Sequence, residues 1–415
     1  MVHPFLQSTA QRLLFRIMLY QALINIYSIA IFLSSKFGNE KAKKWVNGRK
    51  NWRQNIEKLP KNSTLFHCAS LGEFDQGAPV IEAWKKKFPN ETILVSFFSP
   101  SGMEHHHKRG IQLDGVCYMP IDTRKNMRDF LNLVAPKRIF LIKYEFWPNL
   151  INEAFACKIP VFSLATLLRP NQLYFKWYGT FFRKSIRKVT HFFTQNSETN
   201  ALLTSIDCNQ FTLVGDPRFD TVIARKAQRI PDDKMVNFIA NKSAIILGSA
   251  WEKEAEILAS CLDHFDNDKI IIAPHEINSN SIGRLKKLFP QALCYTDQAL
   301  DSKKQILILD TIGQLANAYA HGDVAFVGGG YHGSLHNILE PAVYGLPICF
   351  GPKHSKFPEA SQFLKNEFAR EIISGEDLVI FINEMRNQRD CVSSKILAFV
   401  EQEQGATKRI LAYFP

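Results

Sequence analysis

Short apolar runs alternate with longer amphipathic segments along most of this chain, and the alternation occurs twice. In the first half the apolar runs include STLFHCAS (63–70) and RIFLIKY (138–144). After a polar break at GDPRFD (215–220), the pattern restarts at AIILGSA (244–250) and continues to PICFGP (347–352). Strands that alternate with helices form parallel sheets covered on both faces. The pattern predicts an α/β protein with two successive doubly wound halves.

The length of 415 residues also exceeds what a single hydrophobic core usually serves. We expect residues 1–55 to form a membrane anchor and a basic stretch. Residues 56–217 are expected to form a first Rossmann-like domain, and residues 218–415 a second one. The last helix of the chain is expected to pack back on the first domain.

The N-terminal segment from Ile17 to Ser35 contains nineteen residues without a charge. Arg12 and Arg16 precede it, and seven basic residues follow between Lys36 and Arg53. A helix of this length just reaches across a bilayer, although its polar residues also suit a helix that lies in the interface. The flanking charge predicts a cytoplasmic location for the body of the protein. A buried helix of the first domain is the alternative.

Composition narrows the class of partner. The net charge is +12 and the pI about 9.2, which favours an anionic partner. No sequence signature of a nucleic-acid-binding fold accompanies the charge, so nucleic acid is not expected. The eight cysteines are scattered singly, which is typical of reduced thiols in the cytosol. The adjacent histidines at 105–107 lack the spacing of metal ligands, and no metal site is expected.

Unusual residues follow the predicted strands. Ligands of open α/β sheets bind beyond the carboxyl ends of the strands. Five groups stand at such ends, and two facing domains would gather them around a central cleft. These groups are Ser70–Glu73, Ser99–Gly102, Glu145, His275–Glu276 and Gly328–Gly330.

The stretch HCASLGEF (67–74) places Glu73 at the change from strand to helix. Ser70 and Glu73 fit a capping box, in which each side chain satisfies a free amide at the helix start. A carboxylate there could also accept a proton from a sugar hydroxyl. Gly72 is a poor helix former for a position chosen only for stability, which favours the catalytic role.

The stretch VAFVGGGYHGSLHNILEPA (324–342) ends a predicted strand in three glycines. Glycines allow close approach of a ligand to the backbone, and we expect a helix beginning near Ser334–Asn337 whose N-terminus favours a phosphate. Glu340 could accept hydrogen bonds from ribose hydroxyls. A strained turn with no ligand is the alternative.

This stretch resembles the nucleotide-binding segment of the Kdo transferases, bacterial enzymes that move Kdo (3-deoxy-D-manno-octulosonic acid) from CMP-Kdo to the lipid A precursor. Four further stretches resemble motifs of that family in the same order. They are HCASLGEF for H-x-x-S-x-G-E, SFFSPSG (96–102) for T-x-T-P-T-G, YEFWPNLI (144–151) for E-x-E-x-W-P-N, and GDPRFD for G-N-x-K-F-D. The segment DTIGQLANAYAHGDVAFVGG (310–329) also follows the family closely, and the resemblance covers nearly the whole chain.

The resemblance implies the GT-B architecture and an inverting glycosyltransferase at the cytoplasmic face of the inner membrane. It implies no cofactor and no metal, because CMP-Kdo is a substrate. Glu73 maps to the catalytic base. The implied donor-binding residues are Ser99, Ser101, Gly102, Pro274, His275, Glu276, Gly328, Gly329, Gly330, Asn337, Glu340 and Lys353. Residues of the acceptor side or of structural importance are Ser70, Gly72, Glu145 and Arg169.

One departure concerns the donor phosphate. The family usually has an arginine before the histidine of P-R-H-P-E, and Pro274 stands there in this chain. Lys353 or Arg169 could supply the missing positive charge. Two other functions remain open at this point: a GT-B transferase with a UDP-sugar donor, and a membrane-tethered binding protein without catalysis.

Overall fold

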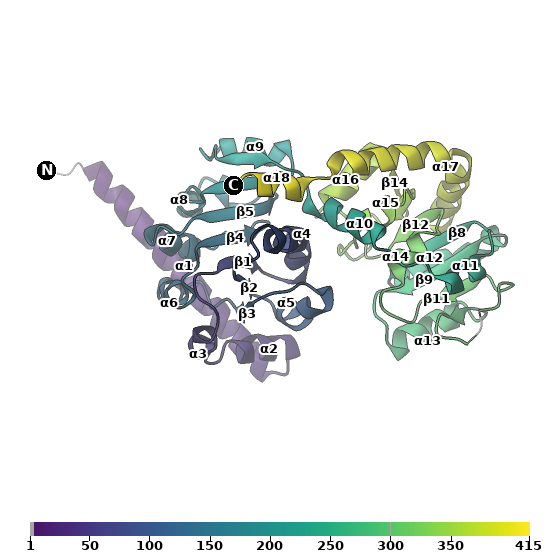
Figure 1. Cartoon of the computed structure of the whole chain (residues 1–415), viewed down its shortest axis with the longest axis horizontal. Helices are drawn as coiled ribbons and strands as arrows, with labels where there is room; N and C mark the ends of the chain where they lie inside the picture. Colours follow the sequence, from purple (N-terminus) through teal and green to yellow (C-terminus); the bar gives the residue numbers. More distant parts are fainter. Residues whose placement is uncertain (1–3, 299) are drawn as a thin grey trace. The chain divides into compact units, whose positions relative to one another are not determined.

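The computed structural model describes residues 4–298 and 300–415, with side chains described from residue 15 onward (Figure 1). The chain divides into two compact units. The first unit contains the residues up to Asp220 together with Gln404–Pro415, and the second contains Thr221–Glu403. Each unit is described below by itself.

The described part of the first unit contains a seven-stranded parallel sheet in the order β3-β2-β1-β4-β5-β6-β7. Its strands are β1 (Thr64–Cys68), β2 (Ile93–Phe97), β3 (Gly115–Tyr118), β4 (Arg138–Ile142), β5 (Val161–Thr166), β6 (His191–Thr194) and β7 (Phe211–Leu213). Its helices are α1 (Pro4–Lys36), α2 (Glu40–Gly48), α3 (Trp52–Glu57), α4 (Leu71–Lys87), α5 (Pro100–His105), α6 (Arg124–Val134), α7 (Pro148–Ala156), α8 (Thr180–Ile186), α9 (Ser197–Thr204) and α18 (Ala406–Ala412), with short 3-10 turns at His106–Arg109 and Leu173–Phe175.

Alternate residues of the central strands enter two separate cores, one on each face of this sheet. Leu65 and Leu141 pack with the buried side chains of α6 and α7. Phe66 and Phe140 stack on each other at 4.8 Å and pack with α4 and α18 on the opposite face. Successive side chains of a strand point to opposite faces, so a run such as TLFHC is apolar on both sides. The first sheet is therefore doubly wound.

The N-terminal helix α1 lies along the first unit and leaves most of its apolar side chains exposed (Figure 1). Tyr20 anchors it, because its hydroxyl donates to Asp122 at 2.7 Å and its ring contacts Phe181 and Phe182. The segment Phe15–Lys36 is long and apolar enough to cross a membrane, and none of its most apolar window is buried. The alternative of a buried core helix is therefore wrong.

The described part of the second unit contains another seven-stranded parallel sheet, in the order β10-β11-β9-β8-β12-β13-β14. Its strands are β8 (Ala244–Ala250), β9 (Lys269–Pro274), β10 (Leu293–Cys294), β11 (Ile306–Ile308), β12 (Val324–Val327), β13 (Ile348–Phe350) and β14 (Ala369–Glu371). Its helices are α11 (Asp233–Ile239), α12 (Glu252–Ser260), α13 (Ser279–Leu288), α14 (Leu315–Tyr319), α15 (Leu339–Ala342), α16 (Pro358–Lys365) and α17 (Gly375–Glu403), with a 3-10 turn at Leu262–Phe265.

Helix α10 (Pro217–Ala227) carries the chain from the first unit into the second. Helix α18 returns to the first unit, where the Asp220 carboxylate accepts hydrogen bonds from the amides of Gly405 and Thr407 at 2.6 and 2.7 Å. Phe414 completes the core on the α4 face, with its ring 4.9 Å from that of Trp84. The first unit is thus built from two separate stretches of the chain.

Candidate functional site

The chain order of the first sheet reverses between β1 and β4, and ligands of open α/β sheets bind beside such a reversal. The register pairs His67 on β1 with Leu141 on β4. The segments that leave the carboxyl ends of these strands carry Glu73, in the first turn of α4, and Glu145. The fold therefore brings these two carboxylates to one edge of the sheet.

Ser70 contacts Glu73 directly. Ser70 is the N-cap residue of α4, but its hydroxyl donates to the Glu73 carboxylate instead of accepting from an amide of the described helix. The capping-box interpretation is therefore wrong, because the two side chains bond to each other. The neighbouring Gly72 is exposed, and a Cβ there would meet the Ser70 hydroxyl at an ordinary 3.7 Å.

Glu145 is a partly buried carboxyl group at this edge of the sheet. Burial and the nearby Glu73 carboxylate raise the pKa of Glu145 to about 7. Burial also raises the pKa of Tyr144, with Glu73, Arg169 and Glu145 as charged neighbours. The structure thus gathers Glu73, Glu145 and Arg169 around Tyr144.

His67 of the same motif plays a different part. It is completely buried in β1, its Nδ1 lies 3.0 Å from the Ser96 hydroxyl, and burial lowers its pKa to about 3. It stays neutral at physiological pH and supports the strand.

The segment after β2 begins α5 at the same edge of the first sheet. Ser99 caps this helix, accepting from the Ser101 amide at 3.3 Å. The Ser99 amide donates to the Ala69 carbonyl at 2.7 Å, which ties this segment to the one that carries Glu73. A Cβ on Gly102 would lie 2.2 Å from the Phe97 ring, so close packing of α5 on β2 requires glycine.

The strand order of the second sheet reverses between β8 and β12. Strand β12 ends at Val327 and is followed directly by Gly328–Gly330. The Gly328 amide donates to Gly248 at 2.8 Å, and the Gly329 amide donates to the Glu254 carboxylate at 2.7 Å. Gly329 has a φ of +87°, and a Cβ on it would meet the Ser334 carbonyl oxygen at 2.2 Å. The amides of Gly328 and Gly329 therefore already have hydrogen-bond acceptors within the protein. The close packing against Ser334 requires glycine at position 329.

The helix expected near Ser334–Asn337 does not begin there. The chain stays irregular to Ile338, and α15 is a single turn, Leu339–Ala342. Asn337 ends the irregular stretch by accepting from the Leu339 amide at 3.1 Å. The expected helix start is therefore wrong, because the helix begins at Leu339 and is a single turn. The phosphate site stays a prediction.

Glu340 is a partly exposed residue on that turn. Its carboxylate lies 3.4 Å from the Asn337 side-chain nitrogen and 3.5 Å from the Arg225 guanidinium. A carboxylate can accept several hydrogen bonds, including bonds from hydroxyl groups.

Four rings form a cluster, here called the aromatic stack, in the segments that follow β8, β9 and β12. Trp251 lies parallel to His275 with ring centroids 4.3 Å apart, and the centroids of His275 and His336 are 4.6 Å apart. His332 lies against Trp251 at 5.2 Å. Burial and the adjacent His275 lower the pKa of His336 to about 4, and burial lowers that of His275. The rings of His275 and His336 are therefore largely neutral at pH 7, and the exposed faces of such rings suit a flat ligand ring.

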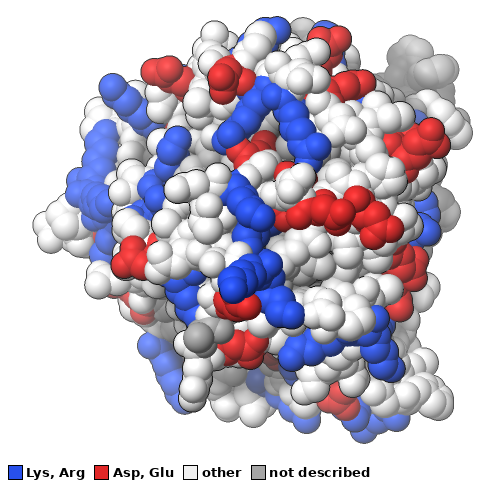
Figure 2. All heavy atoms as spheres, turned by 90° about the vertical axis from the view of Figure 1, so that its right-hand side faces the viewer, with Lys and Arg blue, Asp and Glu red and all other residues white. Residues whose placement is uncertain are grey.

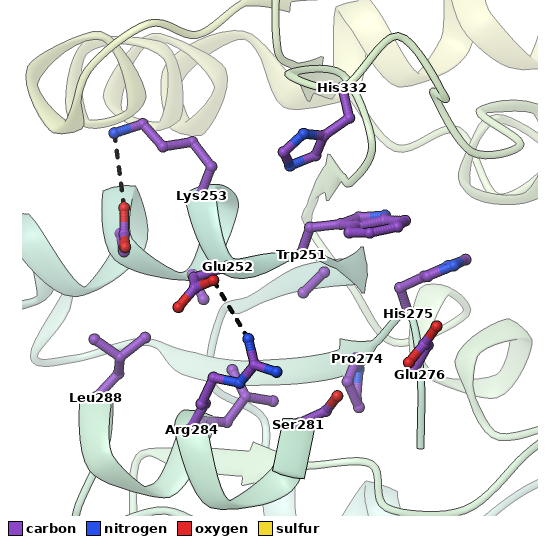
Figure 3. Close-up of a pocket in the computed structure, with 14 residues that line it drawn as sticks. Trp251, Glu252, Lys253, Pro274, His275, Glu276, Ser281, Arg284, Leu288 and His332 are labelled. Carbon is purple, nitrogen blue, oxygen red and sulfur yellow. Dashed lines mark hydrogen bonds and ion pairs between the residues drawn. The ribbon is translucent and has the colours of Figure 1, made fainter. Parts of the chain in front are cut away.

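A pocket of about 460 Å³ opens beside this stack, between α12 and α13 (Figure 3). The pocket is lined by Pro274, His275 and Glu276, which the sequence predicted together. Arg284 faces Glu252 across it at 3.4 Å. Elsewhere in the second unit, the Lys353 amide donates to the Gly330 carbonyl at 2.7 Å.

The sequence reasoning missed Trp251, Glu254, His332 and His336. Glu254 is fully buried, and it accepts from the Trp251 amide at 3.2 Å as well as from Gly329, so it joins the segments after β8 and β12. The position of Trp251 could have been recognised from the sequence, because this residue directly follows the predicted strand 244–250 and ligands bind at such strand ends.

Neither the charges on the face drawn in Figure 2 nor the metal-ligating side chains of the described residues mark a further site. On the face drawn in Figure 2, basic side chains lie interspersed with acidic ones. Within the described part of the chain, no group of three His, Cys, Asp or Glu residues could hold a metal ion.

Comparison with known proteins shows which family the chain resembles. The family model of 3-deoxy-D-manno-octulosonic-acid transferase (kdotransferase) matches residues 43–221. The 3-deoxy-D-manno-octulosonic acid transferase of Aquifex aeolicus is 25% identical over 339 residues, which cover 78% of this chain and 86% of the relative. The chain is therefore similar to the Kdo transferase family, through the family model over residues 43–221 and through relatives of about 25% identity over most of its length. A bifunctional glycosyltransferase/methyltransferase of Fusobacterium nucleatum is 24% identical over 91% of this chain, which spans 60% of that relative's length.

Solved structures confirm the GT-B fold predicted for this chain. A UDP-GlcNAc 2-epimerase from Neisseria meningitidis superposes with a TM-score of 0.60 and 16% identity, covering 85% of this chain and 99% of its own. MurG from Acinetobacter baumannii superposes with a TM-score of 0.51 and 13% identity, covering 85% and 99%. At these identities the likeness concerns the fold alone.

Proposed function

We propose that this protein transfers Kdo from CMP-Kdo to a phosphorylated lipid A precursor, with inversion at the anomeric carbon. The observation that carries the proposal is Glu73, which lies beside the reversal of the first sheet within the region matched by the family model. The Ser70 hydroxyl holds its carboxylate in place.

In the proposed reaction, a hydroxyl oxygen of the acceptor attacks the anomeric carbon of Kdo. The hydroxyl proton passes to the Glu73 carboxylate as the new glycosidic bond forms. The bond between the anomeric carbon and the CMP phosphate oxygen breaks, and its electron pair leaves with CMP. Attack opposite to the leaving group inverts the anomeric carbon. CMP-Kdo is already activated, so the reaction needs no cofactor.

The second unit is proposed to bind the nucleotide. The neutral stack of Trp251, His275 and His336 suits a pyrimidine base, and the Glu340 carboxylate suits ribose hydroxyls. The roles predicted for Ser99, Ser101, Gly102 and Lys353 are part of the same proposal. The exposed apolar helix α1 is proposed to hold the protein at the cytoplasmic face of the inner membrane, where a lipid acceptor is found.

The test is incubation with CMP-Kdo and a tetra-acylated, bis-phosphorylated lipid A precursor, followed by mass spectrometry of the lipid. We expect the precursor to gain the mass of Kdo with the wild-type protein and not with Glu73→Gln. Calorimetry with CMP and UDP tests the donor, and CMP should bind more tightly. Tight CMP binding without any transfer would instead support a non-catalytic binding protein.

A further inference from the structure

A groove of about 420 Å³ lies in the first unit between α1 and α2, a volume within the range of sites that hold small ligands. Its walls are mostly apolar. The residues that line it are Tyr27, Ala30, Ile31, Ser34, Asn39, Lys41, Ala42, Trp45, Phe98, Ser99 and Pro100. None of these residues belongs to the aromatic stack of the second unit.

Three aromatic rings form one end of the groove. The rings of Trp45 and Phe98 meet at 5.6 Å, and Tyr27 stacks on Phe98 at 6.3 Å. The Arg49 guanidinium supports them from beneath, 3.9 Å from the Trp45 ring, and donates to the Phe98 carbonyl at 2.7 Å. This end is therefore rigid, and an apolar chain is the ligand that its surface fits.

The groove also offers polar groups to a ligand with a polar end. The indole N–H of Trp45, a side chain only 7% exposed, has no acceptor among the described residues. Lys41 lines the groove, is exposed and forms no ion pair within the described part of the chain. An apolar ligand that carries a carbonyl oxygen and an anionic group would satisfy both.

The groove is continuous with the apolar face of α1. Tyr27, Ala30 and Ile31 belong to both, and the neighbouring Ile26 and Ile29 are 60% and 58% exposed. A lipid held at this helix would have its acyl chains at the entrance of the groove.

The end of the groove at Phe98 also reaches the edge of the sheet that carries Glu73. Ser99 and Pro100 stand at the carboxyl end of β2, next to β1, and the Ser99 amide donates to the Ala69 carbonyl at 2.7 Å. A ligand in the groove therefore lies on a path from the membrane helix to the proposed base.

We infer that this groove binds one acyl chain of the phosphorylated lipid acceptor, with Lys41 near its anionic head. The inference rests on the proposed function for the identity of the acceptor. The site would fix how deeply the lipid enters, and so present its sugar hydroxyl at the Glu73 edge.

A labelling experiment tests occupancy without requiring transfer. The full chain is mixed with vesicles containing a phosphatidic acid that carries a diazirine on one acyl chain, irradiated and mapped by mass spectrometry. We expect labels on Trp45 or Phe98, which lie inside the groove, and suppression by the tetra-acylated lipid A precursor. Labels confined to the outer face of α1, or equal suppression by phosphatidylglycerol, would overturn the inference.

Kinetics with a matched pair of variants provides the second test. Ala30 lines the groove, whereas Ala22 is an exposed alanine of the same helix outside it. Ala30→Trp should raise the KM for the acylated acceptor roughly 10- to 200-fold, the range for loss of small apolar contacts in a pocket. It should leave the KM for the deacylated bis-phosphorylated disaccharide unchanged, and Ala22→Trp should change neither value.

The outcomes separate the two proposals. An Ala30→Trp variant impaired with both acceptors, or with neither, would overturn the acyl-chain site. Absence of transfer by the wild-type protein, with precursor-suppressible labels on Trp45, would overturn the proposed function and retain a lipid-chain site.

Discussion

The hydroxyl of Ser70 donates a hydrogen bond to the carboxylate of Glu73, and the two residues stand where β1 passes into α4. The bond orients the carboxylate and leaves acceptor sites for a substrate proton, because an ionised carboxyl group accepts several hydrogen bonds. Ser70 caps no amide of the described helix. A substitution at Ser70 or Glu73 therefore tests the role of the carboxylate without removing a helix cap.

Glu73→Gln should lower turnover by roughly 10²–10⁴-fold, the usual contribution of a general base. CMP affinity should stay within the error of calorimetry, because the nucleotide is proposed to bind in the second unit. Ser70→Ala is the matched variant, and it should lower turnover less, because it removes only the orienting bond. A Glu73→Gln enzyme with more than about a tenth of normal turnover would rule out the base assignment.

Glu145→Gln should stabilise the protein at alkaline pH. The pKa of Glu145 is raised to about 7 by burial and by Glu73, so the folded state binds a proton that the unfolded state releases at lower pH. The wild type therefore loses stability as pH rises from the ordinary glutamate range, and the loss is complete above pH 7. The variant should lack this loss. Its free energy of unfolding at pH 8 should therefore exceed that of the wild type by roughly 1–3 kcal/mol. Denaturant unfolding at pH 5 and pH 8 measures it, and an equal difference at both would contradict the prediction.

Glu340→Ala should weaken CMP binding by roughly 1.5–3 kcal/mol, the range for hydrogen bonds to charged groups. Folding should survive, because Glu340 is partly exposed. Glu384→Ala is the control, a partly exposed glutamate of the same unit paired with Arg370 at 2.6 Å. Unchanged calorimetric affinity with a normal melting curve would make Glu340 a structural residue of its turn.

Polar substitution of the exposed face of α1 should release the protein from membranes without unfolding it. Met18, Leu23, Ile26 and Ile29 are each more than half exposed, so their joint replacement by Gln removes lipid contact and little packing. Sedimentation with anionic vesicles measures binding, and what remains should fall with salt. Continued salt-resistant binding by the folded variant would contradict the anchor.

The structure changes the expected effect of removing the helix. Tyr20 supplies a hydrogen bond to the buried Asp122, so deletion of residues 1–35 would leave that carboxylate with one donor fewer. Tyr20→Phe isolates this contribution and should lower the free energy of unfolding by about 1–3 kcal/mol. A variant with unchanged denaturant unfolding would show that α1 is only loosely attached.

The alternation of strands and helices could be predicted from the sequence, because it repeats along the chain. Individual side-chain contacts could not be predicted in this way. The strand expected at 244–250 matches β8, because an apolar run between polar breaks is a strong signal. The helix expected near Ser334 begins only at Leu339. The bond from the Gly329 amide to Glu254 was also missed, because no local pattern indicates a partner 75 residues away. Ser70 shows the same limit, because its spacing to Glu73 fits a cap and a side-chain bond equally well.

The return of α18 to the first unit has a consequence for synthesis on the ribosome. Residues 221–403 form a continuous unit, whereas the core around Trp84 needs Phe414, which is translated afterwards. Domains usually fold in order of synthesis, at about 5–20 residues per second. Here the nascent first unit must wait, with an apolar surface uncovered beside α4, until the entire second unit has emerged. The order of completion is therefore the reverse of the order of translation.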